Sequence, residues 1–176
     1  MKNDVWTVRG KHTAVLGSFL NEATASFQRF KWNPVPQDNS LPGLNYDGLM
    51  RIGSKDTQQN FTQDRLALRD DVTLMNLPWN GDHVVKGGVT YDYLKYHVIK
   101  QLNGNPVFNF RNSTFVSTPG DMPYNAIYGV GDPDLSTNNT QFGLYVQDDW
   151  RITSRFTANV GLRWDFETDM LNNDYE

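Results

Sequence analysis

The sequence predicts an all-β fold of about six long strands that run up and down beside one another. Two observations predict it. Apolar and polar side chains alternate along several stretches, and a period of two gives a strand two chemically different faces. The connections between these stretches are alternately short and long, which suits a series of antiparallel hairpins. The expected strands are residues 3–16, 21–32, 61–76, 83–97, 140–152 and 156–168.

The hairpin from Gln141 to Thr168 carries the clearest alternation. One phase of its second strand holds Phe156, Ala158, Val160, Leu162, Trp164 and Phe166. One phase of its first strand holds Phe142, Leu144, Val146, Trp150 and Ile152. Only Asp148 interrupts this apolar phase, and Thr153 to Arg155 leave room for a short turn. Each arm is about ten residues long, which exceeds the usual globular strand of about five or six and suits a tilted strand that crosses a bilayer.

The first two expected strands alternate more loosely. Gly17 and Ser18 mark a tight turn between them, and Ala23, Ala25 and Phe27 give the second strand a weakly apolar face. Arg29 falls in that apolar phase. A lipid-facing Arg would cost about 2 to 4 kcal/mol at mid-depth and almost nothing near the membrane surface, so we expect Arg29 at the surface.

The third and fourth strands form a second hairpin with a turn at Pro78, Asn80 and Gly81. The apolar phase of the third strand holds Leu66, Leu68, Val72 and Leu74, and that of the fourth holds Val85, Val89, Tyr91 and Tyr93. Asp70 breaks the apolar phase, as Asp148 does in the later hairpin.

Residues 33–60 and 98–139 are expected to be long loops, because they are rich in Asn, Gly and Pro. Structureless loops of this length are uncommon in compact domains. Exposed aromatic side chains in loops are candidates for ligand contact by stacking. The candidate substrate-binding residues are Tyr46, Phe108, Phe110, Tyr124 and Tyr128.

Composition narrows the class of protein. Aromatic residues make up 13% of the chain, yet only 38% is apolar and the mean hydropathy is −0.60. A transmembrane barrel has such a composition because only every second strand residue faces lipid, although a soluble sandwich with long polar loops has it too. The net charge of −4 provides no basic surface for nucleic acid. The absence of Cys removes disulfides and thiol-ligated metal sites.

No catalytic, metal or cofactor site is predicted. His12, His83 and His97 have no metal-site spacing. The stretch from Asp132 through Asp134 and Ser136 to Asn138 is similar to half of a calcium loop, but it lacks the central Gly and closing Glu, so a turn explains it better. In the pairs Asp70–Asp71 and Asp148–Asp149, neighbours on a strand point to opposite faces and do not share one substrate.

Three stretches carry a resemblance to a known family. They are QFGLYVQDDWRITSRFTANVGLRWDFE, LRDDVTLMNLPWNGDHVVKGGVTYDY and FLNEATASFQRF. They resemble the hairpins of TonB-dependent outer-membrane receptors, particularly the Oar-like group that carries a carboxypeptidase-regulatory-like domain. In family terms, His83 and Lys86 are expected to make polar contacts in the lumen or near a turn.

The resemblance implies a segment of an antiparallel up-and-down transmembrane β-barrel, with short periplasmic turns and long extracellular loops. Such barrels have about 22 strands around an N-terminal plug, so residues 1–176 would supply about a quarter of the C-terminal wall. The implied function is uptake of a bulky solute across the bacterial outer membrane, or protein export in the Oar-like group, and not catalysis. The implied partners are outer-membrane lipid, the remaining strands and plug of the same protein, and the TonB complex.

In this arrangement one strand phase faces lipid. The expected lipid-facing residues are Leu66, Leu68, Val85, Val89, Tyr91, Phe142, Leu144, Val146, Phe156, Ala158, Val160, Leu162, Trp164 and Phe166. Trp79 and Trp150 beside short turns and Trp32 near a long loop suit aromatic girdles at the interfaces. One acid of each adjacent pair is expected in the lumen or turn network and the other at the periplasmic rim.

Two alternatives remain open at the level of sequence. The first is a soluble β-sandwich that binds a ligand such as a glycan, and it requires the apolar phases to pack on each other. The second is a β-rich hydrolase, which requires two acids to converge in one cleft. Residues 1–10 lack an apolar signal core, so we expect the chain to be a piece of a longer protein.

Overall fold

The computed structural model describes residues 2–34, 40–54, 57–111 and 122–169. Its strands are β1 (Lys2–Leu16), β2 (Phe19–Asn33), β3 (Gly43–Tyr46), β4 (Met50–Gly53), β5 (Thr57–Pro78), β6 (Asp82–Leu102), β7 (Val107–Phe110), β8 (Asn125–Ile127), β9 (Asp134–Thr153) and β10 (Phe156–Glu167). In these ranges there is no helix with the length and apolar character needed to cross a membrane.

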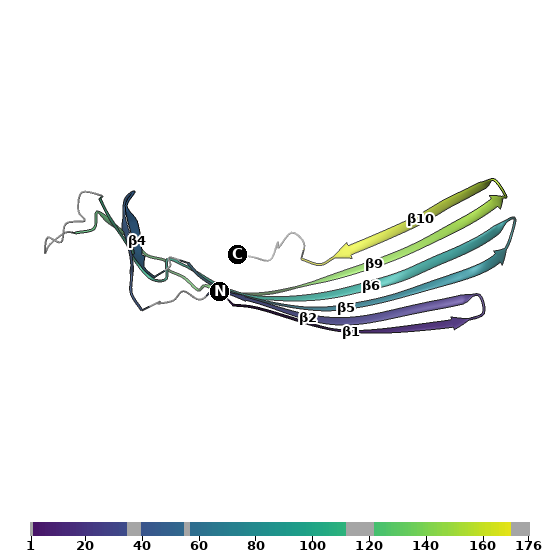
Figure 1. Cartoon of the computed structure of the whole chain (residues 1–176), viewed down its shortest axis with the longest axis horizontal. Helices are drawn as coiled ribbons and strands as arrows, with labels where there is room; N and C mark the ends of the chain where they lie inside the picture. Colours follow the sequence, from purple (N-terminus) through teal and green to yellow (C-terminus); the bar gives the residue numbers. More distant parts are fainter. Residues whose placement is uncertain (1, 35–39, 55–56, 112–121, 170–176) are drawn as a thin grey trace. The chain divides into compact units, whose positions relative to one another are not determined.

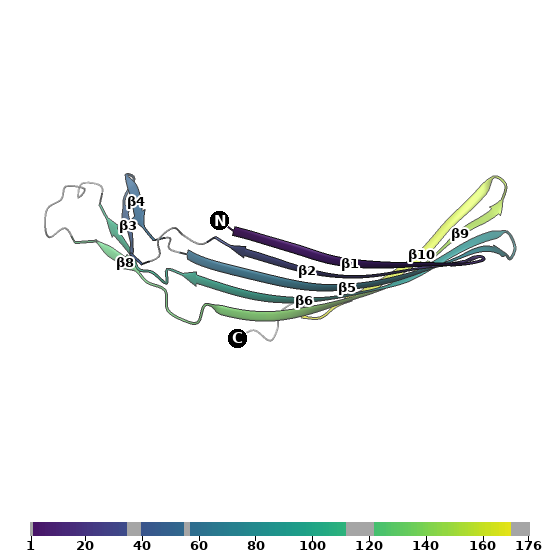
Figure 2. The same ribbon diagram turned by 60° about the horizontal axis from the view of Figure 1, so that its bottom comes forward.

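Six long strands form one sheet in the order β1-β2-β5-β6-β9-β10. Each strand therefore lies beside its predecessor among the long strands, with β1 and β10 at the two edges (Figure 1). The three short turns lie at the same end of this sheet in both views (Figure 2). The expected all-β, up-and-down arrangement is confirmed.

The strands are longer than predicted at the ends remote from the short turns. β5 begins at Thr57, β6 continues to Leu102 and β9 begins at Asp134, so the predicted loops 33–60 and 98–139 were too long. The extensions of β5 and β9, residues 57–60 and 134–139, are rich in polar residues such as Asn, Gln and Thr and show no apolar phase. Their backbone hydrogen bonds come from neighbouring strands, so the alternation of side chains did not predict that these residues are part of the strands.

The turn between β5 and β6 depends on backbone conformations that few residues adopt. Asn80 has a φ of 51° and Gly81 a φ of 125°. Positive φ at consecutive residues is typical of tight hairpin turns, which favour Asn-Gly. A Cβ on Gly81 would lie 2.6 Å from the carbonyl oxygen of Arg151, so glycine also allows the close approach of β9.

The register of β9 with β10 places the apolar phases on one face. Leu162 lies opposite Val146, and Trp164 lies opposite Leu144. The pairing shifts between Phe156 and Thr157, next to the turn. Directly opposite residues share a face of the sheet, so the two alternations found in the sequence combine into one apolar surface.

A second sheet of four short strands has the order β4-β3-β7-β8. β3 and β4 form an antiparallel hairpin, and β7 pairs with β8 in the same way. The two hairpins join through a parallel pairing of β3 with β7, in which Leu44 lies beside Phe108 and Tyr46 beside Phe110. Both expected loops therefore contain strands, which the sequence analysis did not predict.

The chain divides into two compact units, residues 1–4, 30–62 and 96–136 in one, and residues 5–29, 63–95 and 137–176 in the other. Among the described residues only Leu94 and Val107 are buried hydrophobic side chains. Leu162 is 74% exposed and Val160 64% exposed. A soluble sandwich would require these side chains to be buried against a second sheet.

Candidate functional site

The polar phase of the long sheet is lined by ion pairs. Lys86 on β6 lies 2.6 Å from the Asp149 carboxylate on β9, and the Gln147 amide donates to the other oxygen of Asp149 at 3.0 Å. On β10, Arg163 donates to Asp165 at 2.7 Å. Residues two apart on a strand share a face, so these charges form a continuous polar surface.

The same surface continues towards β5. Asp71 accepts hydrogen bonds from the Tyr145 hydroxyl at 2.7 Å and from Arg69 at 3.0 Å. Arg65 on β5 pairs with Asp92 on β6 at 2.8 Å. Asp71 and Asp92 are therefore held by cations or a hydroxyl group, which come from the same strand, from the neighbouring strand or, for Tyr145, from across β6.

A hollow of about 490 Å³ lies on β6, β9 and β10, where Asp92, Gln141 and Glu167 provide polar groups and Phe142 and Phe166 provide apolar ones. Glu167 accepts hydrogen bonds from Asn139 at 2.7 Å and from Gln141 at 3.1 Å. The hollow can contact a polar solute through amide donors and carboxylate acceptors.

The opposite phase of the long sheet is apolar. None of the side chains predicted to face lipid is buried in the structure. Phe142 packs edge-on against Trp164 at 6.0 Å between ring centroids, and Trp164 stacks on Phe166 at 6.1 Å. This face presents a broad apolar surface, whose contact with lipid stays a prediction.

Two polar residues that interrupt the apolar phases have partners on the neighbouring strand. Arg29 makes two hydrogen bonds of 2.6 Å to the two carboxylate oxygens of Asp64. Asn21 donates to Asp70 at 2.6 Å. β5 ends at Pro78, eight residues beyond Asp70, and the expectation that one acid of each adjacent pair lies at the periplasmic rim stays a prediction.

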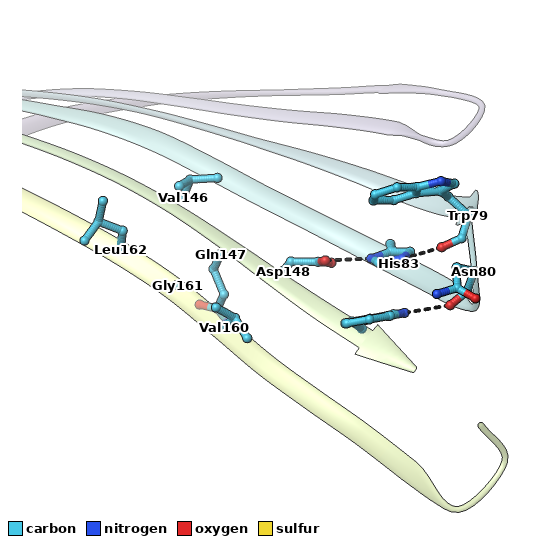
Figure 3. A pocket seen from close by; sticks show the side chains of 10 residues that line it. Trp79, Asn80, His83, Val146, Gln147, Asp148, Val160, Gly161 and Leu162 are labelled. Atoms are coloured by element: carbon cyan, nitrogen blue, oxygen red, sulfur yellow. Dashed lines mark hydrogen bonds and ion pairs between the residues drawn. The ribbon is translucent and has the colours of Figure 1, made fainter. Parts of the chain in front are cut away.

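The third interruption, Asp148, belongs to a cluster at the turn end of the sheet. Its carboxylate lies 2.6 Å from His83 Nδ1, and His83 Nε2 lies 2.7 Å from the carbonyl oxygen of Trp79. The rings of Trp79 and Trp150 stack on the imidazole at centroid distances of 5.9 and 5.2 Å. Figure 3 shows His83 between Trp79 and Asp148, linked to both.

An open groove of about 530 Å³ extends from this cluster along the apolar phase. Val146, Val160 and Leu162 are among the residues that line it, and Asp148 and His83 provide its polar groups. The expectation that His83 makes a contact near the turn is met, but His83 shares the phase of Val85. Lys86, with Asp149, lies in the polar phase.

The small sheet gathers several of the aromatic residues predicted to contact a ligand. Tyr46 stacks on Phe110, with ring centroids 4.9 Å apart and planes inclined by 17°. Leu44 and Phe108 share their face, because they are neighbours in the same parallel register. This face is therefore an aromatic and aliphatic platform.

The remaining ligand candidates lie apart from this stack. Tyr124 donates to Asp47 at 3.3 Å, and this hydrogen bond raises the pKa of the Tyr124 phenol above its usual value. The guanidinium of Arg111 lies 6.0 Å from the centre of the Tyr124 ring. Tyr128 is 64% exposed.

An amide ladder crosses the other face of the small sheet. Asn45 donates to Asn109 at 2.8 Å, and Asn109 donates to Asn125 at 2.6 Å. Asn109 is only 6% exposed, so its side chain depends on these two partners. The ladder fixes the position of β7 between β3 and β8.

The adjacent acids Asp70 and Asp71 lie on opposite faces of the sheet and do not form a catalytic pair. Asp70 bonds Asn21, whereas Asp71 bonds Tyr145 and Arg69 on the opposite face. Asp132 accepts a hydrogen bond from the backbone of Asp134 at 2.9 Å, as in a turn. No group of three potential metal-binding side chains occurs within the described ranges.

Sequence reasoning missed the cluster around His83 and the pairing of β3 with β7. A usable signal existed for the first: Asp148 and His83 both interrupt apolar phases, and each is near a Trp in sequence. No local signal existed for the second, because about 60 residues separate the two paired segments.

Comparison with known proteins gives three findings. Residues 5–176 match the family described as "Outer membrane beta barrel domain". The chain is 28% identical over 128 residues to the TonB-dependent transporter Oar of Myxococcus xanthus, an alignment that covers 66% of this chain and 12% of Oar.

The fold is similar to that of the outer membrane transporter YddB from Escherichia coli, with a TM-score of 0.66 and 13% identity. This match covers 97% of the chain and 24% of YddB. The chain thus spans much less than two thirds of either protein.

Proposed function

The chain belongs to the outer membrane beta barrel domain family, and from this premise we propose that it is a wall segment of a larger barrel that takes up a bulky solute. Its location is the cell outer membrane, and its relatives are transporters, not enzymes. One observation carries the proposal: the long sheet has an exposed apolar face and an opposite face lined by ion pairs.

In this proposal the apolar face meets lipid. Exposed Leu, Val, Phe and Trp side chains gain free energy in hydrocarbon at about 25 cal/mol per Å² of apolar area. The polar face, with Lys86–Asp149 and Arg65–Asp92, lines the aqueous lumen. Transmembrane barrels alternate apolar-out and polar-in along each strand in the same manner.

The edges of the sheet require further strands. β1 and β10 end the strand order, so each has one edge without a partner strand in the described chain. Unpaired backbone N–H and C=O groups in hydrocarbon cost several kcal/mol each. We propose that other strands of the same full-length protein pair with these edges, around a plug that contacts the TonB complex.

The short turns then face the periplasm. Trp79 is 79% exposed beside the β5–β6 turn, and Trp150 bonds the carbonyl oxygen of Asn80 at 3.0 Å. Tryptophan prefers the membrane–water interface, and this preference supports a hydrocarbon rim near the turns. The β3–β7 platform, with Tyr46 and Phe110, then belongs to the extracellular segments that first meet the solute.

The wall-segment proposal is tested on the full-length gene product recovered from outer membranes, beside the 176-residue chain. The full-length product should migrate as a compact, heat-unfoldable barrel, and the isolated chain should require detergent to remain in solution. A soluble, cooperatively unfolding monomer formed by the isolated chain would contradict the proposal.

Uptake is tested in cells that produce the full-length protein, with a labelled oligopeptide and a labelled oligosaccharide as probes. We expect accumulation of at least one probe that a protonophore abolishes. Deletion of residues 107–132 should abolish it as well. Equal accumulation in cells without the protein would refute uptake of that class of solute.

The aromatic platform has a sharper test. Phe110→Ala removes one ring of the stack with Tyr46 and should reduce the rate of uptake by about two- to tenfold, because stacking on an aromatic pair contributes about 0.5 to 1.5 kcal/mol. Tyr46→Phe keeps the stack and is the matched control. Unchanged uptake by Phe110→Ala would exclude the platform from solute binding.

A further inference from the structure

The charge on His83 follows from the geometry around its ring. The side chain is only 8% exposed. Nδ1 lies 2.6 Å from a carboxylate oxygen of Asp148 and Nε2 lies 2.7 Å from the carbonyl oxygen of Trp79. A carbonyl oxygen only accepts hydrogen bonds, so Nε2 must carry a proton.

The same reasoning applies to Nδ1. An ionised carboxylate only accepts hydrogen bonds, whereas a neutral imidazole has a single N–H to donate. With Asp148 ionised, two acceptors on the two ring nitrogens require a doubly protonated, positively charged ring. The faces of Trp79 and Trp150, which stack on the ring, also favour a cation.

The charged groups around His83 agree with this assignment. Asp148 faces it from β9, and its second carboxylate oxygen is buried without a hydrogen-bond partner in the part of the chain that the structure describes. Asp82 and Arg151, both well exposed, lie 3.1 Å from each other. Lys86 is on the opposite face with Asp149. β10 contributes Val160 and Leu162 to this region and no charge.

We propose that protonated His83 is a pH-sensitive latch that holds the β5–β6 turn against β9. The ring joins the carbonyl of Trp79, which is in the turn, to Asp148 on β9. Loss of one proton leaves a nitrogen lone pair facing an oxygen lone pair. One of the two contacts then breaks and the turn is freed on that side.

His83 is the second residue of β6 and lies beside the turn, outside the proposed hydrocarbon span. The hydrogen bond with Asp148 raises the pKa of its imidazole. Because the folded state holds the proton more tightly, the latch contributes fully below the ordinary imidazole value of about 6.5. Its contribution is lost as the pH rises through the higher value of the folded state.

The charge is measured on the full-length protein in lipid bilayers with ¹⁵N-labelled histidine. Subtraction of the spectrum of His83→Asn isolates the ring of interest. We expect both ring nitrogens to be protonated at pH 7. A single protonated nitrogen at pH 7, with the second proton absent or on Asp148, would overturn the proposal.

The latch itself is measured by the heat-unfolding midpoint between pH 6 and 9. The variant Asp148→Asn removes the carboxylate, and Asp149→Asn is the matched control on the opposite face. The difference in unfolding midpoint between the native protein and Asp148→Asn should shrink as the pH rises. The difference between the native protein and Asp149→Asn should stay constant. A difference for Asp148→Asn that does not change with pH would exclude a latch.

Discussion

Tyr145 on β9 donates its hydroxyl to Asp71 on β5 at 2.7 Å, across the intervening strand β6. The bond is possible because Gly88 of β6 has no side chain. A Cβ at Gly88 would collide with the Tyr145 ring and the Asp71 carboxylate. One hydrogen bond on the polar face therefore joins β5 and β9 across β6.

Gly88→Ala should destabilise the barrel by about 1 to 3 kcal/mol, because an inserted methyl group forces the bonded pair apart. Gly87→Ala is the control, since its Cβ would lie 3.5 Å from the Tyr145 carbonyl, an ordinary contact. The heat-unfolding midpoint of the full-length protein measures both. Equal midpoints for the two variants would show that the bond across β6 does not matter for stability.

Leu162→Arg should destabilise the protein by up to about 2 kcal/mol, because Leu162 lies two residues further from the turn than Val160, which is opposite Asp148, and the cost of a lipid-facing Arg rises with depth. Asn159→Arg places the same charge in the polar phase of β10 and should be nearly neutral. Urea unfolding of the full-length protein in lipid vesicles compares the two. If both variants were equally tolerated, the apolar phase would not face lipid.

The Arg29–Asp64 pair predicts a coupled effect. Arg29→Leu leaves the Asp64 carboxylate without its bidentate partner, so the unfolding midpoint should fall. The double variant Arg29→Leu with Asp64→Leu removes both charges and should recover most of that loss, since a paired charge in an apolar setting is replaceable by apolar residues. The midpoints of the native protein, both single variants and the double variant form a complete cycle. A double variant with the summed loss of the singles would exclude coupling.

The amide ladder makes Asn109 more sensitive to substitution than Asn125. Asn109→Ala leaves polar groups of both Asn45 and Asn125 without partners, and should cost about 1 to 3 kcal/mol locally. Asn125→Ala, at the exposed end of the ladder, should cost less. Limited proteolysis of the full-length protein on cells reports the opening of β7. Faster cleavage of Asn125→Ala than of Asn109→Ala would reverse the proposed order.

The alternation along Phe156 to Phe166 was enough to predict a strand and its faces, because side chains on a strand obey a period of two whatever lies around them. Turn chemistry was also readable, as Asn80 and Gly81 show. The polar ends of β5 and β9 were not readable, since their order depends on hydrogen bonds from neighbouring strands.

In the candidate site, too, the sequence predicted individual residues but not their partners. Arg29 and Asp148 stood out in the sequence as misfits, but their partners Asp64 and His83 are 35 and 65 residues away in the chain. Tyr46 and Phe110 were chosen as separate loop aromatics, and only the parallel pairing of β3 with β7 makes them one stack. These contacts depend on the register between strands that are far apart in the chain, and the local sequence does not predict that register.

The short turns and the small sheet together suggest how such a chain tolerates mutation. A single residue inserted within β6 would turn the side chains that follow it to the opposite face of the sheet, exchanging charges for apolar groups along the rest of the strand. Insertions in the segments between β2 and β5 and between β6 and β9 do not change the faces of the long strands, because these segments form a separate four-stranded sheet. Descendants of this gene are therefore free to change what these segments recognise while they inherit the wall unaltered.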